Sequence, residues 1–280
     1  MPPVITSIGA FKQNLTGGAF EALAAATGDS LAVPNFNAGT KGYLLEAWAG
    51  NSANAGEFGI RSPFFHDNIR GMRLDAMFNP TLSGADGDPQ MLLGYHVRQP
   101  LYRSDTLIVE VNATATNNVG LGMLQYYEDL DGSDQQLDRF EAIEPYIVNT
   151  LGIRVAVTAG AAGDYGSTRA LNADDDRLRA NVDYAVLGIT TQLPVCTISI
   201  KAPETSNRRI GLPGHWLQDK SADWFVDISQ RYRIAAIPVI NANNRGGTFL
   251  EAADPGGAIA TLATVQLAQL DTTYPGPPSS

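Results

Sequence analysis

The chain has 280 residues and a mass of 29.8 kDa, enough to bury a large core without disulfides or a structural metal. Hydrophobic residues make up 44% and charged residues 17% of it, which excludes an intrinsically disordered chain. The 28 glycines and 16 prolines favour many turns over a helical bundle. A formal net charge of −10 repels the phosphate backbone of nucleic acids, so direct binding of nucleic acid is not expected.

Neither a signal peptide nor a membrane span is indicated. Residues 1–10 lack a basic region followed by a continuous apolar stretch. The most apolar long stretch, residues 184–200, is interrupted by polar residues and a proline and is too short to span a bilayer. We therefore expect a soluble protein made in a cytoplasm.

The first predicted element along the chain is a short helix over Gly18–Ala26, where Phe20, Leu23 and Ala24 share one face. The other strong signals are extended, β-rich runs. These runs are Thr106–Ala113, Val195–Lys201, Arg233–Ala242 and Thr261–Leu270. The sequence therefore predicts an all-β protein with antiparallel sheets and minor short helices.

The strand over 195–201 is predicted to be half-buried, with Cys196, Ile198 and Ile200 inward and Thr197, Ser199 and Lys201 outward. Turns are predicted at 117–120, 243–247 and 254–257, where Asn, Asp, Gly and Pro gather. Residues 159–176 are predicted to be a surface loop or a flexible crossing segment. The Pro-rich end, Tyr274–Ser280, is predicted to be an extended arm or a frayed tail.

The two halves of the chain resemble each other at several points. The matched pairs are Tyr43–Trp48 with Tyr184–Ile189, Arg61–Pro63 with Lys201–Pro203, Val111–Gly120 with Ile240–Gly246, and Leu130–Asp131 with Leu270–Asp271. They keep one order at offsets of roughly 126 to 141 residues, which predicts two tandem sandwiches of about eight strands each. We expect domains at 1–150 and 151–280, with the boundary near 149–176. Chance similarity of two β-rich halves is the alternative.

No pattern of catalytic or metal-binding residues is found. His66, His96 and His215 have no paired metal-ligand spacing, and loop-packing or surface roles are expected for them. The single cysteine, Cys196, is expected to be a small core residue and not a reactive thiol. No GxSxG elbow is present. Gly160–Gly166 has the spacing of neither a dinucleotide-binding nor a Walker loop, so we expect a plain glycine loop.

Three weaker signals leave alternatives open. The acidic runs Asp129–Asp134 and Asn172–Asp176 could bind calcium but do not fit an EF-hand, and solvated acidic loops are favoured. Carboxylates that could meet across a cleft for glycoside hydrolysis are Glu46, Asp75, Asp223 and Asp227. Trp48, Trp216 and Trp224 could form a platform for stacking sugars, although core or interface positions are more common.

The paired stretches Tyr43–Ala113 and Tyr184–Ala242 resemble the jelly-roll capsid proteins, especially the double jelly-roll type of icosahedral bacteriophages. The resemblance is one of architecture. It implies a structural virion protein that self-assembles, commonly as trimers with a pseudo-sixfold outline, into an icosahedral shell. It implies no enzymatic activity, with no catalytic, cofactor-binding or metal residues.

The resemblance also implies homo-oligomer contacts, other virion proteins as partners and an internal membrane as one arrangement beneath the shell. Met1–Lys12 and Thr272–Ser280 are the predicted arms that reach neighbouring subunits. The competing functions are a carbohydrate-binding β-sandwich and a glycosidase-like enzyme.

Overall fold

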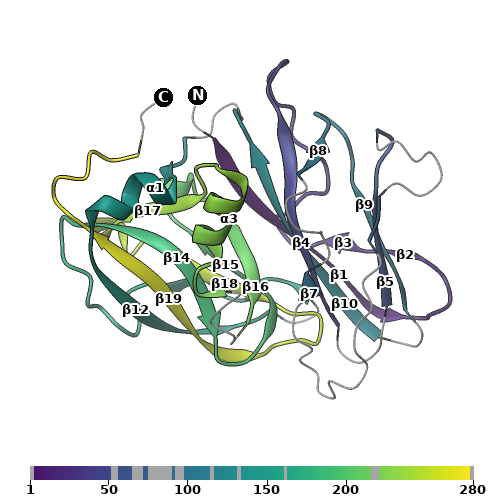
Figure 1. Ribbon diagram of the computed structural model, residues 1–280. Helices are drawn as coiled ribbons and strands as arrows, with labels where there is room; N and C mark the ends of the chain where they lie inside the picture. The colour runs from purple at the N-terminus through teal and green to yellow at the C-terminus, as the bar shows by residue number, and fades with distance from the viewer. Residues whose placement is uncertain are drawn as a thin grey trace.

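The computed structural model describes residues 3–51, 56–64, 72–74, 90–91, 98–113, 117–130, 134–160, 163–215 and 221–277 (Figure 1). Strands dominate this part of the chain, and its helical segments are few and short. All strand pairs are antiparallel and form four sheets in the described residues. The predicted all-β architecture of two tandem antiparallel sandwiches is confirmed.

The first sandwich consists of an inner and an outer sheet. The inner sheet has the strand order β3-β1-β10-β4, with β7 and β8 both pairing with β4, and the outer sheet has the order β2-β9-β5-β6. The strands are β1 (Val4–Leu15), β2 (Glu21–Ala22), β3 (Ala24–Ala25), β4 (Gly42–Asn51), β5 (Gly56–Arg61), β6 (Met72–Leu74), β7 (Gln90–Met91), β8 (Gln99–Leu101), β9 (Ile108–Ala113) and β10 (Asn117–Tyr127).

The second sandwich is again built from two sheets. Its inner sheet has the order β13-β18-β15-β16, and its outer sheet has the order β11-β17-β14-β19-β12. The strands are β11 (Leu137–Asp138), β12 (Ile147–Thr158), β13 (Arg169–Ala170), β14 (Asp183–Thr191), β15 (Val195–Lys201), β16 (Ile210–Gly214), β17 (Ile237–Asn241), β18 (Phe249–Ala253) and β19 (Ala260–Leu270). The helical segments are α1 (Phe140–Ile143), η1 (Glu144–Tyr146), η3 (Pro203–Thr205), α3 (Trp224–Tyr232) and η4 (Ala242–Asn244).

Both sandwiches have the same strand order. In the first, β1, β10, β4 and β8 lie side by side in one sheet, and β2, β9, β5 and β6 in the other. In the second, β12, β19, β14 and β17 take the places of the first set, and β13, β18, β15 and β16 those of the second. The chain visits the eight places in the same sequence each time, and the first strand pairs with the last, as in a jelly roll.

The internal repeat is therefore real in structure, although one predicted match is wrong. Tyr43–Trp48 and Tyr184–Ile189 lie in the equivalent strands β4 and β14. Val111–Ala113 lies in β9, whereas Ile240 and Asn241 end β17 and Ala242 begins η4. The true equivalent of β9 is β18, Phe249–Ala253, at the same offset of about 140 residues as the correct pairs. Shared Asn and Gly residues after two unrelated strands produced the false match.

The four sheets are stacked as layers, with the two inner sheets in contact (Figure 1). The inner sheet of the first sandwich is consequently buried on both faces. On one face Val4, Ala47 and Met123 join the core of the first sandwich. On the other face Ile5 and Trp48 join the core of the second.

This stacking corrects the prediction of a half-buried β15. Ile198 and Ile200 face the core of the second sandwich as expected. Thr197 and Ser199, predicted to face solvent, are fully buried because that side of β15 packs against the first sandwich. Cys196 is buried too, which confirms its predicted place in the core.

Three local predictions in the first sandwich are wrong. Residues 18–26 form the strands β2 and β3 in place of a helix, because this segment hydrogen-bonds to two different sheets: Leu23 N–H donates to Val109 O at 2.8 Å, and β3 pairs with β1. The predicted turn at 117–120 is the start of β10. Its Gly120 serves close packing, since a Cβ there would lie 2.6 Å from the ring of Phe11. Residues 4–12, predicted as an arm, form β1 in the middle of the inner sheet.

The segment that joins the sandwiches is 128–146, which carries β11, α1 and η1. The described residues of 159–176 are largely loop, as predicted, but this segment connects β12 to β14 inside the second sandwich and does not cross between sandwiches. The predicted turns at 243–247 and 254–257 are confirmed. The division into domains at 150/151 stays a prediction; β12 runs through that position.

Candidate functional site

Trp48 occupies the centre of the contact between the two inner sheets. Its indole Nε1–H lies 2.8 Å from the carbonyl oxygen of Cys196 and 3.2 Å from Oγ1 of Thr197. Its ring meets that of Trp224 edge-on, with centroids 5.8 Å apart. A Cβ at Gly122 would lie 2.2 Å from the Trp48 ring, so glycine is required there to let the indole lie against β10.

The alternative of a tryptophan platform for sugars therefore does not hold for two of its three members, which take the core or interface positions that the sequence analysis gives as more common. Trp48 is fully buried and Trp224 is 5% exposed, so neither ring offers a face to a ligand. Trp216 lies outside the described residues. The indoles instead join the two sandwiches through one continuous apolar core.

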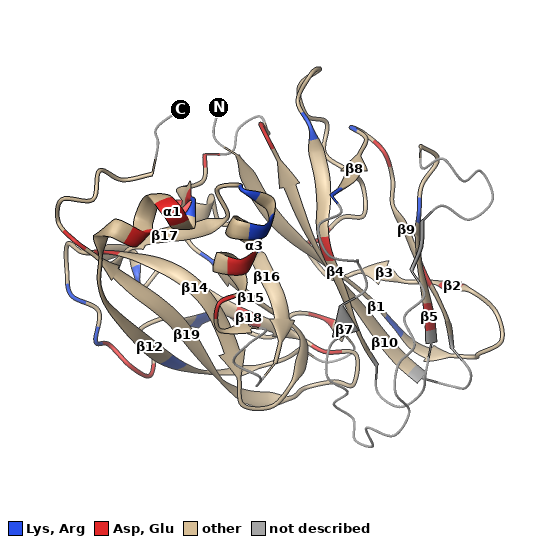
Figure 2. Ribbon diagram, in the orientation of Figure 1, with Lys and Arg blue, Asp and Glu red and all other residues tan. Residues whose placement is uncertain are grey.

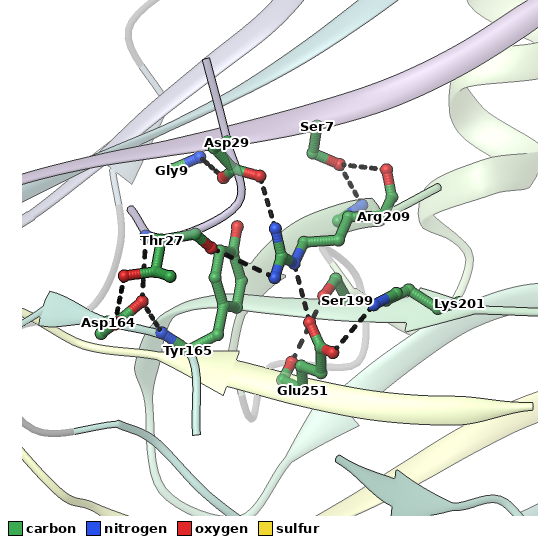
Figure 3. Close-up of polar contacts among 11 residues, drawn as sticks. Ser7, Gly9, Thr27, Asp29, Asp164, Tyr165, Ser199, Lys201, Arg209 and Glu251 are labelled. Carbon is green, nitrogen blue, oxygen red and sulfur yellow. Dashed lines mark hydrogen bonds and ion pairs between the residues drawn. The ribbon is translucent and has the colours of Figure 1, made fainter. Parts of the chain in front are cut away.

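Arg209 is the centre of a buried ionic cluster that also lies between the two sandwiches, shown in Figure 3. Its guanidinium pairs with Asp29 of the first sandwich at 2.6 Å and with Glu251 of the second at 2.7 Å. The guanidinium carbon lies 4.0 Å from the ring centroid of Tyr165, a cation–π contact. Lys201 pairs with the second oxygen of Glu251 at 3.2 Å. A single arginine thus connects a loop and two sheets.

Burial raises the pKa of the Asp29 carboxyl, and the hydrogen bond from Gly9 N–H and the charge of Arg209 act against that rise. The Gly9 nitrogen lies 2.7 Å from Oδ2 of Asp29. The backbone completes the junction, because Ser7 N–H donates to the carbonyl of Arg209 at 2.8 Å and Gly211 N–H donates to Ser7 Oγ. The carboxylates of this cluster are thus matched by donors from both sandwiches.

The glycine loop at 160–166 contributes to the same junction. Thr27 donates to Asp164 through its hydroxyl at 2.7 Å and its backbone N–H at 3.1 Å. Burial alone would raise the pKa of Asp164, but these bonds and that from Tyr165 N–H lower it overall. A Cβ at Gly166 would lie 1.7 Å from the carbonyl oxygen of Thr158. The loop therefore has a packing role, in agreement with its interpretation as a plain glycine loop.

A second ionic cluster joins β4 to α3. Glu46 is 1% exposed, and its Oε1 lies 2.5 Å from Nη1 of Arg231 and 3.0 Å from the hydroxyl of Tyr232. Arg231 also pairs with Asp227 one turn earlier on α3. Burial raises the pKa of Glu46 to about 7, against the lowering effect of Arg231 and Tyr232.

Two of the four carboxylates suggested for glycoside hydrolysis, Glu46 and Asp227, thus come together. They do so by sharing Arg231, and the burial of Glu46 leaves a substrate no access to its oxygens. Asp223 precedes α3 at its N-terminus, and Asp75 lies outside the described residues. Figure 2 shows acidic and basic positions together on α3. The arrangement is that of a structural ion pair.

Gln135 forms a third junction that the sequence did not indicate. Its side-chain amide bonds to both backbone groups of Ile5 in β1, at 2.8 and 2.9 Å, and to the carbonyl of Thr205 at 3.1 Å. The side chain is 3% exposed. It therefore replaces a missing strand partner at the edge where the chain passes between sandwiches.

A polar cavity of about 300 Å³ lies next to Arg209. Its lining includes Ser7, Asp29, Lys201 and Arg209, and the three charged side chains among them take part in the ion pairs described above. Pockets for small ligands are mostly apolar with a few polar groups, and this one has the opposite character. We regard the cavity as a gap within the polar cluster around Arg209 and not as a ligand pocket.

The remaining predicted residues do not form a site in the described residues. His215 is 3% exposed and packs in the interior, while His66 and His96 lie outside the described residues. Asp129 accepts a hydrogen bond from Asn37 at 3.0 Å. Within the described ranges no three His, Cys, Asp or Glu side chains are placed to hold a metal ion, and no helix there is long and apolar enough to cross a membrane.

No protein-family model and no curated protein matches the chain. Similar solved structures include the PBSX exported protein XepA, at 11% identity and a TM-score of 0.24 over 94% of this chain and 86% of that one. The major capsid protein P2 of bacteriophage PM2 is 6% identical with a TM-score of 0.23, covering 97% and 99%. A structure of Sulfolobus Turreted Icosahedral Virus is 9% identical with a TM-score of 0.22, covering 98% and 92%. The jelly-roll assignment rests on the strand order.

Proposed function

We propose that this protein is a viral coat protein whose copies associate, as trimers, into an icosahedral shell. The observation that carries the proposal is the repetition of one jelly-roll strand order in two sandwiches that share a buried interface. Three such chains around a threefold axis would present six similar sandwiches, and a nearly hexagonal outline tiles a closed surface.

The interface between the sandwiches supports this proposal. A tiling unit must keep a fixed shape, and here Trp48 of the first sandwich is part of the core of the second, while Arg209 and Arg231 bind carboxylates of the first sandwich. Buried, well-matched contacts of this kind oppose independent movement of the two sandwiches. A flexible pair of binding modules would not need them.

The role proposed is structural and not enzymatic, with the virion as the place of the mature protein after synthesis in the host cytoplasm. Its partners would be further copies of itself and other virion proteins, with an internal membrane as one arrangement beneath the shell. The net charge of −10 disfavours direct packing of the genome. The expected division at 1–150 and 151–280 and the C-terminal tail as an arm belong to the same proposal.

The structure shows how far the C-terminal segment packs against its own sandwich. Tyr274 is 9% exposed, its hydroxyl lies 2.8 Å from Oδ2 of Asp138, and its ring packs edge-on against Tyr146. The chain is therefore anchored to its own sandwich up to Tyr274, and any arm that reaches a neighbour would begin after it.

Sedimentation velocity of the purified chain, across protein concentration and salt, tests the proposal. We expect a species of three times 29.8 kDa or larger closed assemblies. A strict monomer under every condition would contradict self-driven assembly. Binding of that monomer to a polysaccharide would favour the carbohydrate-binding alternative.

A further inference from the structure

The strand β12 forms an edge of the second sandwich. It pairs with β19 on one side and is the last strand of its sheet in the part of the chain that the structure describes. Along Ile153–Thr158 its side chains alternate between buried and exposed. An edge strand of 12 residues presents backbone N–H and C=O groups that can template pairing with another chain.

A neighbouring loop occupies the outer side of this edge. Ala156 N–H donates to Oδ2 of Asp174 at 2.8 Å, and the backbone N–H of Arg154 contributes to lowering the pKa of the Asp175 carboxyl. The guanidinium of Arg177 donates to the carbonyl of Gly152. Residues 152, 154 and 156 alternate along β12, so these are the backbone groups that point away from β19. Side chains thus take the place of a further strand.

Ion pairs hold the capping side chains in position. Arg169 pairs with Asp174 at 2.6 Å, and Arg177 with Asp175 at 2.7 Å. The side-chain bond from Arg169 is the main cause that lowers the pKa of Asp174, and that from Arg177 is the main cause for Asp175. Both carboxylates therefore stay ionised as acceptors near neutral pH.

The acidic run Asn172–Asp176 thereby finds an explanation other than calcium binding. Its third carboxylate, Asp176, pairs with Arg245 at 2.6 Å and not with β12. Figure 2 shows acidic and basic residues together along this loop beside β12. Each carboxylate of the run is matched by a cation or a backbone donor.

We propose that Asp174, Asp175 and Arg177 guard the edge of β12 and thereby prevent a second copy of this chain from adding its own β12 there. The occupant is a second copy because the edge is self-complementary. Two antiparallel copies about a twofold axis bring each outward N–H opposite an outward C=O. Beyond the guard, Val148 is 54% exposed at the open end of the strand, where such pairing would begin. This inference does not depend on the proposed coat function.

The test removes the guard and measures association. The triple variant Asp174→Ala, Asp175→Ala and Arg177→Ala is compared with the parent by sedimentation velocity. We expect concentration-dependent species of at least twice the parent's mass, whatever assembly the parent forms. The matched control is Asp176→Ala, which removes a carboxylate of the same run that does not bind β12, and it should sediment like the parent.

Hydrogen exchange verifies that the guard acts where proposed. The amides of Arg154 and Ala156 should be protected in the parent and, in freshly diluted triple variant, exchange at least tenfold faster than those of Ile153 and Val155. Protection unchanged by the three substitutions would overturn the proposal. So would a folded triple variant with exposed amides that keeps the parent's mass.

Adding Ala156→Pro to the triple variant decides which edge associates. Proline removes an outward N–H without removing a hydrogen bond to β19, as edge strands tolerate. We expect this variant to sediment with the same mass as the parent. Association that persists in this variant would mean that another surface is responsible, which would also overturn the proposal. Near-ultraviolet circular dichroism reports whether each variant is folded.

Discussion

The substitution Arg209→Met should destabilise the contact between the sandwiches more than the loss of a comparable ion pair at the surface. It removes the guanidinium but keeps an unbranched side chain that can still pack against Tyr165. Glu251 retains Lys201 at 3.2 Å, so Asp29 is the group left without its cation. The Asp29 side chain is 6% exposed, and only the Gly9 N–H among its described hydrogen bonds would remain.

The expected loss of stability follows from the burial of Asp29. Removing one partner of a buried ion pair typically destabilises a protein by about 3–5 kcal/mol, because the other charge stays desolvated. At about 2–4 °C per kcal/mol for a chain of this size, the melting temperature should fall by roughly 10 °C. Adding Asp29→Asn removes the stranded charge while its amide oxygen can still accept from Gly9. The double variant should therefore be more stable than Arg209→Met alone.

Urea unfolding followed by tryptophan fluorescence measures these differences, because Trp48 is buried at the same interface. The matched control is Arg169→Met. Arg169 forms an ion pair of the same length, 2.6 Å, but its side chain is 48% exposed, so its loss should destabilise the protein far less than the loss of Arg209. Equal, small effects of the two substitutions would refute the view that the Arg209 cluster holds the sandwiches together.

Three further outcomes are expected. Because burial raises the pKa of Glu46 from 4.5 to about 7, the folded protein holds a proton that the unfolded chain releases; the associated stability is present below pH 4.5 and lost as the pH rises to 7. Urea midpoints of Glu46→Gln should lack this dependence, which amounts to about 3 kcal/mol, and an unchanged pH profile would contradict it. Gly122→Ala should destabilise by about 1–3 kcal/mol or more by displacing the Trp48 indole, whereas Gly246→Ala, with open space around it, should change the urea midpoint little. Cys196 is 1% exposed and burial raises its thiol pKa, so a thiol reagent should modify it only as fast as the protein unfolds; fast labelling of the native protein would contradict its burial.

Strand patterns were predictable from sequence where one face of a strand meets a core. The strand at 106–113 behaves as expected, with Val109 and Val111 buried and Glu110 and Asn112 partly exposed. In β15 the same pattern failed for Thr197 and Ser199. Their burial depends on the packing of a second sandwich against the first, and nothing in the local pattern of β15 carries that information.

The charged residues at the contact between the two sandwiches show why the sequence did not predict the candidate site. Arg209 and Asp29 lie 180 positions apart in the sequence, as do Glu46 and Arg231 at 185. A single sequence does not indicate which of its charged residues meet over such a separation. The glycine content of β10 is a usable signal, because Gly120 and Gly122 in a strand indicate close approach of other groups, whereas the turn prediction at 117–120 treats Gly120 as a turn residue.

The most direct test of the coat function is electron microscopy of the assembled protein. We predict class averages with six lobes around a threefold axis, two from each chain, together with sheets or closed shells built from that unit. Particles of a single two-lobed chain in every preparation, including those at high concentration, would contradict the account.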